Sequence, residues 1–336
     1  MLAPLALAFV IALGGGFVYR RLAPRRALDL PNERSSHTRP VPRGGGLVIV
    51  GGFLIGLASW LGVGGTLSPR AWGWLVGALL VATVSFIDDL HPLPATPRLA
   101  VHGIGAILLT IVGVQERELP LLVALPLAFV WIALVTNVYN FMDGIDGLAA
   151  SQAVIAGLAI LAAGAIVGNP LIGIAAGLIA AASAGFLVHN LPPARLFMGD
   201  VGSTFLGFSF AALVLLGNLG VGGGRLPIEF GIVILAPFLF DSIVTLARRV
   251  ARGERWYAAH RSHYYQRLVV RGASHAQVTA LYAGLALIAA VAALFGLQAG
   301  EPLRQALAVA AYVPMLAVVG LVWRLEASNV VTPGRS

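Results

Sequence analysis

Long apolar runs, separated by short polar segments, dominate this chain of 336 residues. Eleven of these runs are bounded by loop residues and can be delimited, at about 2–19, 44–64, 70–87, 97–114, 119–137, 147–167, 170–189, 202–220, 226–247, 276–298 and 303–323. About 20 helical residues cross the hydrocarbon core of a bilayer. Only 11% of the residues are charged, whereas soluble domains carry about 25%. We therefore predict an all-α, polytopic membrane bundle of about 10–11 transmembrane helices, forming a single domain over 1–336.

The basic residues predict how this bundle is oriented. All 22 are arginines, and 18 of them fall in the tail or in alternate connections, against four in the opposite set. The positive-inside rule places the richer set in the cytoplasm, with the N-terminus periplasmic and the C-terminus cytoplasmic. The first run lacks a basic leader and precedes Arg20 and Arg21, so we expect a membrane anchor there. The net charge of +8 then reflects membrane topology and contact with lipid headgroups, and we expect no nucleic-acid partner.

Some chemistry is excluded by residues that the chain lacks. Without lysine, the protein can form no Schiff base and has no Walker-type lysine. Without cysteine, it has neither disulfides nor a cysteine-ligated metal.

Acidic residues gather at the predicted cytoplasmic boundary. This set comprises Asp88, Asp89, Asp143, Asp146 and Asp200. A transporter more often places carboxylates near the bilayer midplane, so the pattern favours an enzyme over a transporter or flippase of an anionic glycolipid. A scaffold protein would not explain the one-sided set. Asp241 alone lies well inside a predicted span, in its cytoplasmic half.

Asn137, Asn140, Asp143 and Asp146 share one polar segment, each pair three residues apart. In a helix, residues at that spacing lie on one face. Four potential ligands within ten residues favour a binding site for a divalent cation and a phosphorylated ligand. The alternative is an ordinary polar turn between two membrane helices.

Two further segments carry carboxylates. The adjacent Asp88 and Asp89 end a span, where the helix dipole disfavours acids, so a magnesium or phosphate site is preferred over a solvated boundary. The segment around Asp200 and Ser203 contains glycines and precedes the eighth predicted span, at 202–220. It fits an anion site at a helix start or, equally well, a plain N-cap.

Arginines and histidines mark two predicted cytoplasmic loops. His260, Arg261 and His263 lie in an arginine-rich connection, which favours a phosphate site over a lipid-headgroup belt or a zinc site. Arg43 precedes Gly44–Gly46, whose amides could approach a phosphate or whose small size could let helices pack closely. His102 and His189 are expected to make hydrogen bonds inside the bundle.

Taken in order, these segments resemble the polyprenyl-phosphate N-acetylhexosamine-1-phosphate transferase superfamily. The matching signatures are Asp88-Asp89, Asn137-x-x-Asn140-Phe-Met-Asp143-Gly-Ile-Asp146-Gly, Phe197-Met-Gly-Asp200-Val-Gly-Ser and the histidine loop at 260–263. Many members carry an HHH or HxHH cluster, whereas this chain reads His260-Arg-Ser-His263. With Pro-Arg43-Gly-Gly-Gly, that form looks more like the O-antigen-initiating branch than the peptidoglycan branch.

The resemblance implies a reaction and a location. Such enzymes transfer a sugar 1-phosphate from a UDP-N-acetylhexosamine to undecaprenyl phosphate, release UMP and require Mg²⁺, with Mn²⁺ as a substitute. We expect the bacterial inner membrane and a cytoplasmic active site. The phospho-MurNAc-pentapeptide transferase reaction is the alternative. Direct attack and an aspartyl-phosphate intermediate both stay open, as do the sugar and a homodimeric state.

The resemblance also implies residue roles. Asp200 corresponds to the metal ligand, and Asp88 and Asp89 to the pair that handles the lipid phosphate, Asp88 being the candidate base. Asn140 and Asp143 correspond to the nucleotide site, and Phe197 to a ring that stacks on uracil. The full expected set is catalytic Asp88, Asp89, Asp143, Asp146, His260 and His263, and substrate-binding Asn137, Asn140, Phe197, Arg43 and Arg261.

Overall fold

The computed structural model describes residues 2–23, 28–29, 40–91, 93–111, 120–255 and 261–328, and these are mostly helical. The elements are α1 (Leu2–Leu22), β1 (Leu28–Asp29), β2 (Val41–Pro42), α2 (Gly46–Gly62), α3 (Pro69–Leu90), α4 (Ala95–Ile111), α5 (Leu121–Phe141), α6 (Leu148–Val167), α7 (Pro170–Asn190), α8 (Gly199–Asn218), α9 (Ile228–Ile234), α10 (Ala236–Ala251), α11 (Tyr264–Val270), α12 (His275–Gln298), α13 (Glu301–Ala310) and α14 (Val313–Ser328). The two short strands form an antiparallel pair.

The predicted all-α membrane bundle is confirmed. Within the described ranges, eight helices, with α13 and α14 taken together, are long and apolar enough to cross a membrane, and the bent pair α9 and α10 makes a ninth. α2 and the segment 96–109 are apolar but shorter. Every predicted run therefore coincides with a helix or a helix pair. The run at 226–247 was predicted as a span, and the structure divides it into α9 and α10, which meet at an angle of 77°.

The bend between α9 and α10 has identifiable causes. Pro237 lies in the first turn of α10, where a proline cannot donate to the preceding helix. The carbonyl of Ile234, at the end of α9, instead accepts a hydrogen bond of 2.8 Å from the Gln152 side chain of α6. Tyr312 donates to the carbonyl of Ile232 at 3.2 Å. Side chains from neighbouring helices thus satisfy the backbone that the break exposes.

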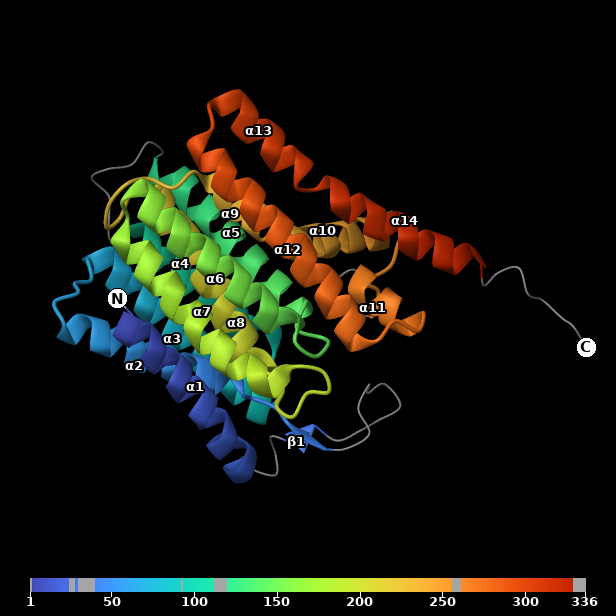
Figure 1. The fold of residues 1–336 in the computed structure, drawn as a ribbon, viewed down its shortest axis with the longest axis horizontal. Helices are drawn as coiled ribbons and strands as arrows, with labels where there is room; N and C mark the ends of the chain where they lie inside the picture. Colours follow the sequence, from blue (N-terminus) through green and yellow to red (C-terminus); the bar gives the residue numbers. More distant parts are fainter. Residues whose placement is uncertain are drawn as a thin grey trace, which may run out of the picture.

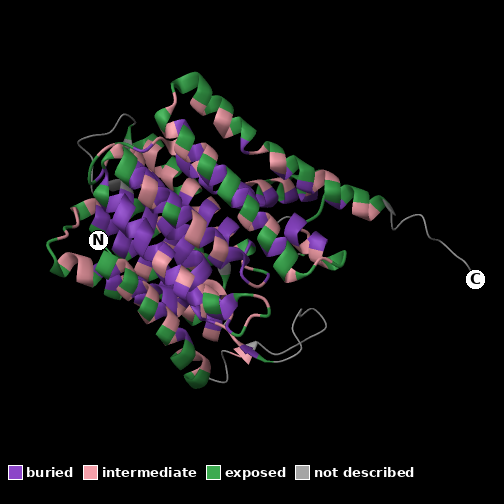
Figure 2. Ribbon diagram, in the orientation of Figure 1, coloured by how far each residue is buried: buried purple, intermediate pink, exposed green. Residues whose placement is uncertain are grey.

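Helices α7 and α8 form the centre of the bundle (Figures 1 and 2). Most of their residues are buried, including nearly the whole length of α8, which contacts α2, α3 and α5. In α7, His189 makes the expected internal hydrogen bond, to the carbonyl of Leu13 at 2.9 Å. In α4, Nδ1 of His102 is buried without a hydrogen-bond partner among the described residues, so the expected bond is not made at that nitrogen.

A close backbone contact fixes α2 against α8. A Cβ atom on Gly46 would lie 2.2 Å from Cα of Gly202, so any larger side chain would overlap the α8 backbone. The amides of Gly45 and Gly46 donate to the carbonyls of Phe197 and Met198, at 2.9 and 2.8 Å. Of the two readings of the glycine triplet, close helix packing is the one that these contacts support.

Replacing Gly46 tests this contact. Gly46→Ala is expected to destabilise the protein by about 1–3 kcal/mol, as overpacking commonly does, and to lower its melting temperature in detergent. Gly51→Ala is the matched control, since a Cβ at that position of α2 meets no atom within 4 Å. It should leave the melting temperature unchanged or raise it. Equal melting temperatures for the two variants would contradict the packing argument.

Candidate active site

The buried start of α8 is capped by an acid from another helix. Asp89, at the end of α3, accepts the amide of Asp200 on Oδ1 and the amide of Val201 on Oδ2, both at 3.0 Å. Asp89 is only 5% exposed. α8 receives no side-chain cap from its own N-cap residue, Met198. The alternative that Asp200 or Ser203 is the N-cap is therefore wrong.

The close approach of α3 and α8 needs a glycine at position 199. Gly199 has φ of +73°, a conformation that favours glycine. A Cβ there would also lie 2.7 Å from Oδ2 of Asp89. The glycine that precedes Asp200 thus lets the Asp89 carboxylate reach the helix amides.

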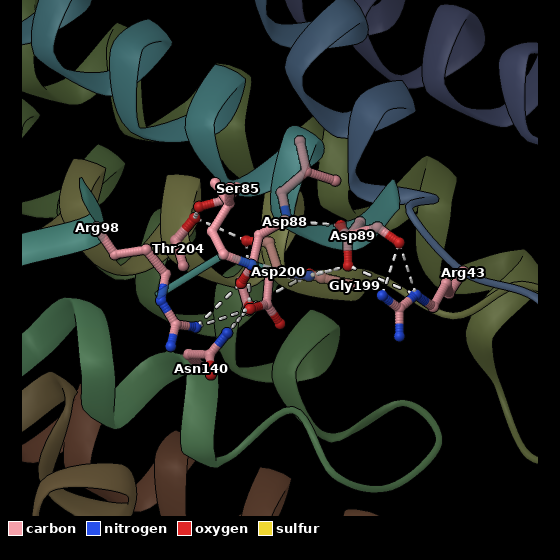
Figure 3. Close-up of polar contacts among 12 residues, drawn as sticks. Arg43, Ser85, Asp88, Asp89, Arg98, Asn140, Gly199, Asp200 and Thr204 are labelled. Carbon is pink, nitrogen blue, oxygen red and sulfur yellow. Dashed lines mark hydrogen bonds and ion pairs between the residues drawn. The ribbon is translucent and has the colours of Figure 1, made fainter. Parts of the chain in front are cut away.

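Arg43 holds the end of α3 from the other side. Its Nη2 and Nε donate to the backbone carbonyl of Asp89, at 2.6 and 3.2 Å, and Nε lies 3.9 Å from Oδ1 of the same residue. The carbonyl of Arg43 in turn accepts from the Tyr19 hydroxyl of α1 at 2.9 Å. Arg43 was predicted to bind substrate, and with its side chain 39% exposed it supports the site from its edge (Figure 3).

Asp88 and Asp200 converge on one guanidinium nitrogen. Nη1 of Arg98, in α4, donates to Oδ2 of Asp88 at 3.1 Å and to Oδ2 of Asp200 at 3.5 Å. The other oxygen of Asp88 accepts the amide of Leu93 at 2.5 Å. Figure 3 shows the two acids and the arginine together, on the opposite side of Asp89 from Arg43. The two carboxylates therefore share a cation, although the residues are 112 positions apart in the sequence.

A chain of hydrogen bonds connects α5 and α3 to the first turn of α8. Asn140 donates through Nδ2 to Oγ of Ser203 at 3.0 Å, and it lies beside Asp200 (Figure 3). Thr204 donates to the carbonyl of Asp200 at 2.6 Å and pairs with Ser85 of α3 at 2.8 Å. Asn140, predicted to bind substrate, is thus next to the carboxylates. Asn137 instead donates to the carbonyl of Ala133, within its own helix, at 2.7 Å.

Asp146 ties together three parts of the chain. Its Oδ2 accepts the amide of Ala194 at 2.9 Å, and its Oδ1 lies 3.3 Å from Nδ1 of His275. Its carbonyl accepts from Thr279 at 2.7 Å. These contacts join the 142–147 loop to the 191–198 loop and to the start of α12. They give Asp146 a structural task beside its predicted catalytic one.

Asp143 is the acid of the 142–147 loop whose pKa responds to the other acids of the site. Burial raises its pKa well above the ordinary aspartate value, and the charges of Asp200, Asp89 and Asp146 raise this pKa further. A carboxylate in such surroundings is stabilised by protonation or by a cation.

Phe197 lies in the 191–198 loop, which connects α7 to α8. Its amide donates to the carbonyl of Pro42 at 2.8 Å, and its side chain is only partly buried. Buried Asn190 shapes the loop by accepting from the amide of Gly147 at 3.0 Å and donating to the carbonyl of Leu196 at 2.9 Å. Phe197 is thus held at the same end of the bundle as Asp200.

The histidine loop reaches the end of α5. The His263 ring lies 6.1 Å from that of Phe141, and Tyr265 donates to the carbonyl of Phe141 at 2.9 Å. Nδ1 of His263 lies 3.1 Å from Oδ1 of Asp241. Arg261 is exposed. His260, the other predicted catalytic histidine, lies outside the described residues.

Comparison with known proteins decides the family. A family model described as glycosyl transferase family 4 matches residues 71–218. A Bacillus subtilis protein named "Probable undecaprenyl-phosphate N-acetylglucosaminyl 1-phosphate transferase" is 35% identical over 260 residues, which cover 74% of this chain and 71% of the relative. The chain belongs to the polyprenyl-phosphate N-acetylhexosamine-1-phosphate transferase superfamily.

Two further relatives also match this chain. The decaprenyl-phosphate N-acetylglucosaminephosphotransferase of Mycobacterium tuberculosis is 29% identical over 322 residues, covering 82% of this chain and 78% of the relative. A phospho-N-acetylmuramoyl-pentapeptide-transferase of Lactiplantibacillus plantarum is 32% identical over 211 residues, which cover 55% of this chain and 63% of the relative. The resemblance in the sequence is confirmed at the level of the superfamily.

The carboxylates of this transferase suit a hard divalent cation. Mg²⁺ is usually held by one or two carboxylates, together with water and substrate phosphates. Asp88 and Asp200, which already share a cationic partner in Arg98, supply such a pair. The described residues contain no group of three or more His, Cys, Asp or Glu side chains arranged to hold a metal. A bound ion would therefore complete its coordination with water and substrate.

Two residues of this site escaped the sequence analysis. Arg98 was counted only as a topology signal, and its position ten residues after Asp88, at the start of the next helix, is the one clue to its contact. Asp241 stood out as an acid inside a span but received no role. Its partner His263 is 22 residues further along the chain.

Replacing Asp143 tests the electrostatics of the loop. Because the folded protein raises the pKa of Asp143, ionisation of this acid opposes folding, and this cost grows as the pH rises above the unfolded value of about 3.9. Asp143→Asn removes the cost. In chelator-treated protein, the variant should melt above wild type at neutral pH, and the difference should shrink as the pH falls toward about 4. An asparagine variant that melts below wild type at neutral pH would contradict this account.

Proposed function

We propose that this protein transfers N-acetylhexosamine 1-phosphate from a UDP-N-acetylhexosamine to undecaprenyl phosphate, forming undecaprenyl-diphospho-N-acetylhexosamine and UMP. The observation that carries the proposal is the convergence of Asp88 and Asp200 on Arg98, at the end of an apolar bundle. A reaction between a membrane lipid and a water-soluble nucleotide sugar needs charged groups at such a boundary.

For this reaction the protein must mainly align the two substrates and neutralise their negative charge. An oxygen of the lipid phosphate attacks the β-phosphorus of the UDP-sugar. A new P–O bond forms there, the bond from the β-phosphorus to the bridging oxygen breaks, and UMP leaves with that electron pair. The attacking phosphate is already anionic, so it needs little activation. Holding two anions in line, in a site that neutralises their charge, is the larger task.

The residues of the site divide this task. Arg98 can bind phosphate oxygens through its planar fork of donors, which frees Asp88 and Asp200 to hold Mg²⁺, or Mn²⁺ in its place. When bound, that ion would neutralise charge on the diphosphate. Through that ion, Asp88 would also handle the lipid phosphate; because a carboxylate that holds a cation is a weak base, we assign it no proton transfer. Asp89 supports both acids by fixing the start of α8.

The nucleotide is assigned to the neighbouring loops. We place it against Asn140, Asp143 and Phe197, the last with a partly exposed ring for stacking on uracil. His263 and Arg261, at the start of α11, are assigned to the diphosphate. The arginine distribution supports a cytoplasmic site in the inner membrane.

N-acetylglucosamine is the sugar that we propose first. The Bacillus subtilis and Mycobacterium tuberculosis relatives are both named for it. A role in starting O-antigen synthesis rests on the form of the histidine loop. The peptidoglycan-branch reaction is the second candidate, because relatives named for it match over parts of the chain, such as the Lactiplantibacillus plantarum protein.

A membrane assay tests the proposal directly. Membranes carrying the protein would receive undecaprenyl phosphate, Mg²⁺ and one donor at a time: the UDP-linked forms of GlcNAc, GalNAc, QuiNAc and FucNAc, and UDP-MurNAc-pentapeptide. We expect UMP release and a diphospholipid product with UDP-GlcNAc, both lost on chelation. A product only with UDP-MurNAc-pentapeptide would favour the second candidate, and no release with any donor would refute the transferase reaction.

In the same assay, Asp200→Asn should lower the rate of UMP release by about 100- to 1,000-fold, the range seen when one group that stabilises transition-state charge is removed. Glu301→Gln makes the same chemical change at an exposed acid of α13 and should leave the rate unchanged. Normal membrane insertion of both variants would show that folding is intact. An Asp200→Asn variant with the wild-type rate would remove Asp200 from the metal site.

A further inference from the structure

Asp241 is a carboxylate that the proposed reaction does not use directly. It lies in α10 near the break with α9, and only 2% of its surface is exposed. A charged group inside an apolar bundle is costly unless it is fully hydrogen-bonded. Such residues in membrane segments commonly serve function, so the contacts of Asp241 indicate its task.

Five groups surround this carboxylate. Three of them face Oδ1 and two face Oδ2, at distances between 2.5 and 3.2 Å. They come from α10, from the histidine loop with α11, and from α12. They are Oγ1 of Thr245, Nδ1 of His263 and the amide of Tyr264 on Oδ1, and the amide of Tyr265 and the hydroxyl of Tyr282 on Oδ2.

This arrangement indicates which nitrogen of His263 carries a proton. The backbone amides of Tyr264 and Tyr265 can only donate, and each occupies a different carboxylate oxygen. Both oxygens of Asp241 therefore act as acceptors, which is the behaviour of an ionised carboxylate. Nδ1 of His263, 3.1 Å from Oδ1, is then assigned as the donor in this contact.

The same contacts fix where the imidazole lies. Asp241 binds the first two amides of α11, and Tyr265 of that helix reaches the carbonyl of Phe141 at 2.9 Å. His263 is 4% exposed as a residue, and its ring packs beside those of Phe141 and Tyr265, at 6.1 and 5.8 Å between ring centres. The ring is thereby held next to Phe141 at the end of α5, and Asp143 follows Phe141 by two residues.

We propose that Asp241 is a positioning residue of the transferase: it holds His263 with Nδ1 protonated, so that Nε2 is the nitrogen that meets the substrate diphosphate. Phosphate oxygens only accept hydrogen bonds, so Nε2 donates and the ring is an imidazolium during transfer. Asp241 balances that charge, as the orienting carboxylate of a histidine commonly does. The inference rests on the proposed reaction and adds to it the residue that orients the histidine.

A double-mutant cycle tests the proposal. Asp241→Asn should lower kcat for UMP release by about 10- to 100-fold, with little change in KM for the UDP-sugar, as loss of an orienting partner typically does. Tyr282→Phe is the matched control, because it removes a donor from Oδ2 and leaves the Oδ1–His263 contact intact. It should cost no more than about 5-fold.

The decisive comparison places Asp241→Asn in a His263→Ala background. If Asp241 acts through His263, the substitution there should change the rate less than in the wild-type background. An equal loss in both backgrounds, or a folded Asp241→Asn variant with wild-type kcat, would overturn the proposal. Melting temperatures of all variants report whether each is folded.

A spectroscopic measurement on the unaltered protein covers the case in which Asp241→Asn does not fold. The protein would be labelled with ¹⁵N-histidine, and the signals of His263 would be assigned by their loss in His263→Gln. Protonated Nδ1 supports the proposal, and a neutral ring protonated only at Nε2 overturns it. This readout needs no activity. A wild-type protein that releases no UMP would therefore refute the proposed function separately.

Discussion

The active end of this bundle depends on the contact between the Asp89 carboxylate and the first amides of α8. Among the described helices of membrane-spanning length, α8 has the largest buried share, and the amides at its start have no partner within the helix. An acid from α3 satisfies two of them and lies at the positive end of the helix dipole. The same contact fixes Asp200, whose own amide is one of the donors, against the end of α3.

Two adjacent acids consequently have different tasks. Asp89 points toward the α8 backbone and is nearly inaccessible, whereas Asp88 faces Arg98 together with Asp200. Like charges this close need a cation between them, and Arg98 supplies one. A guanidinium can exchange a carboxylate partner for a phosphate. The cluster is thus suited to receive a metal ion and a diphosphate together.

The helices could be predicted from the sequence because membrane helices satisfy their own backbone, so an apolar run of sufficient length is enough. The break at Pro237 could not, because proline is tolerated in a first turn and the side chain that satisfies the exposed carbonyl of Ile234, Gln152, is 82 residues away in the sequence. The motif residues Asp88, Asn140 and Asp200 were found by type and spacing. Their grouping with Arg98 depends on how α3, α4, α5 and α8 pack, which no local pattern encodes.

The histidine loop shows the same limit. His263 was predicted from its arginine-rich surroundings, and Asp241 was recognised as unusual inside a span. Their contact requires the bend between α9 and α10, which turns the α10 acid toward the start of α11. A hydrophobic pattern gives the helix but not its direction after the break.

Locating a bound cation tests the central claim most directly. Crystals of the protein grown with Mn²⁺ and UDP would give an anomalous difference map that places the ion. The account predicts a manganese peak within coordination distance, about 2.0–2.3 Å, of carboxylate oxygens of Asp88 and Asp200, with the guanidinium of Arg98 moved onto the diphosphate. A manganese peak elsewhere on the protein, with Arg98 still bridging the two acids while UDP is bound, would contradict it.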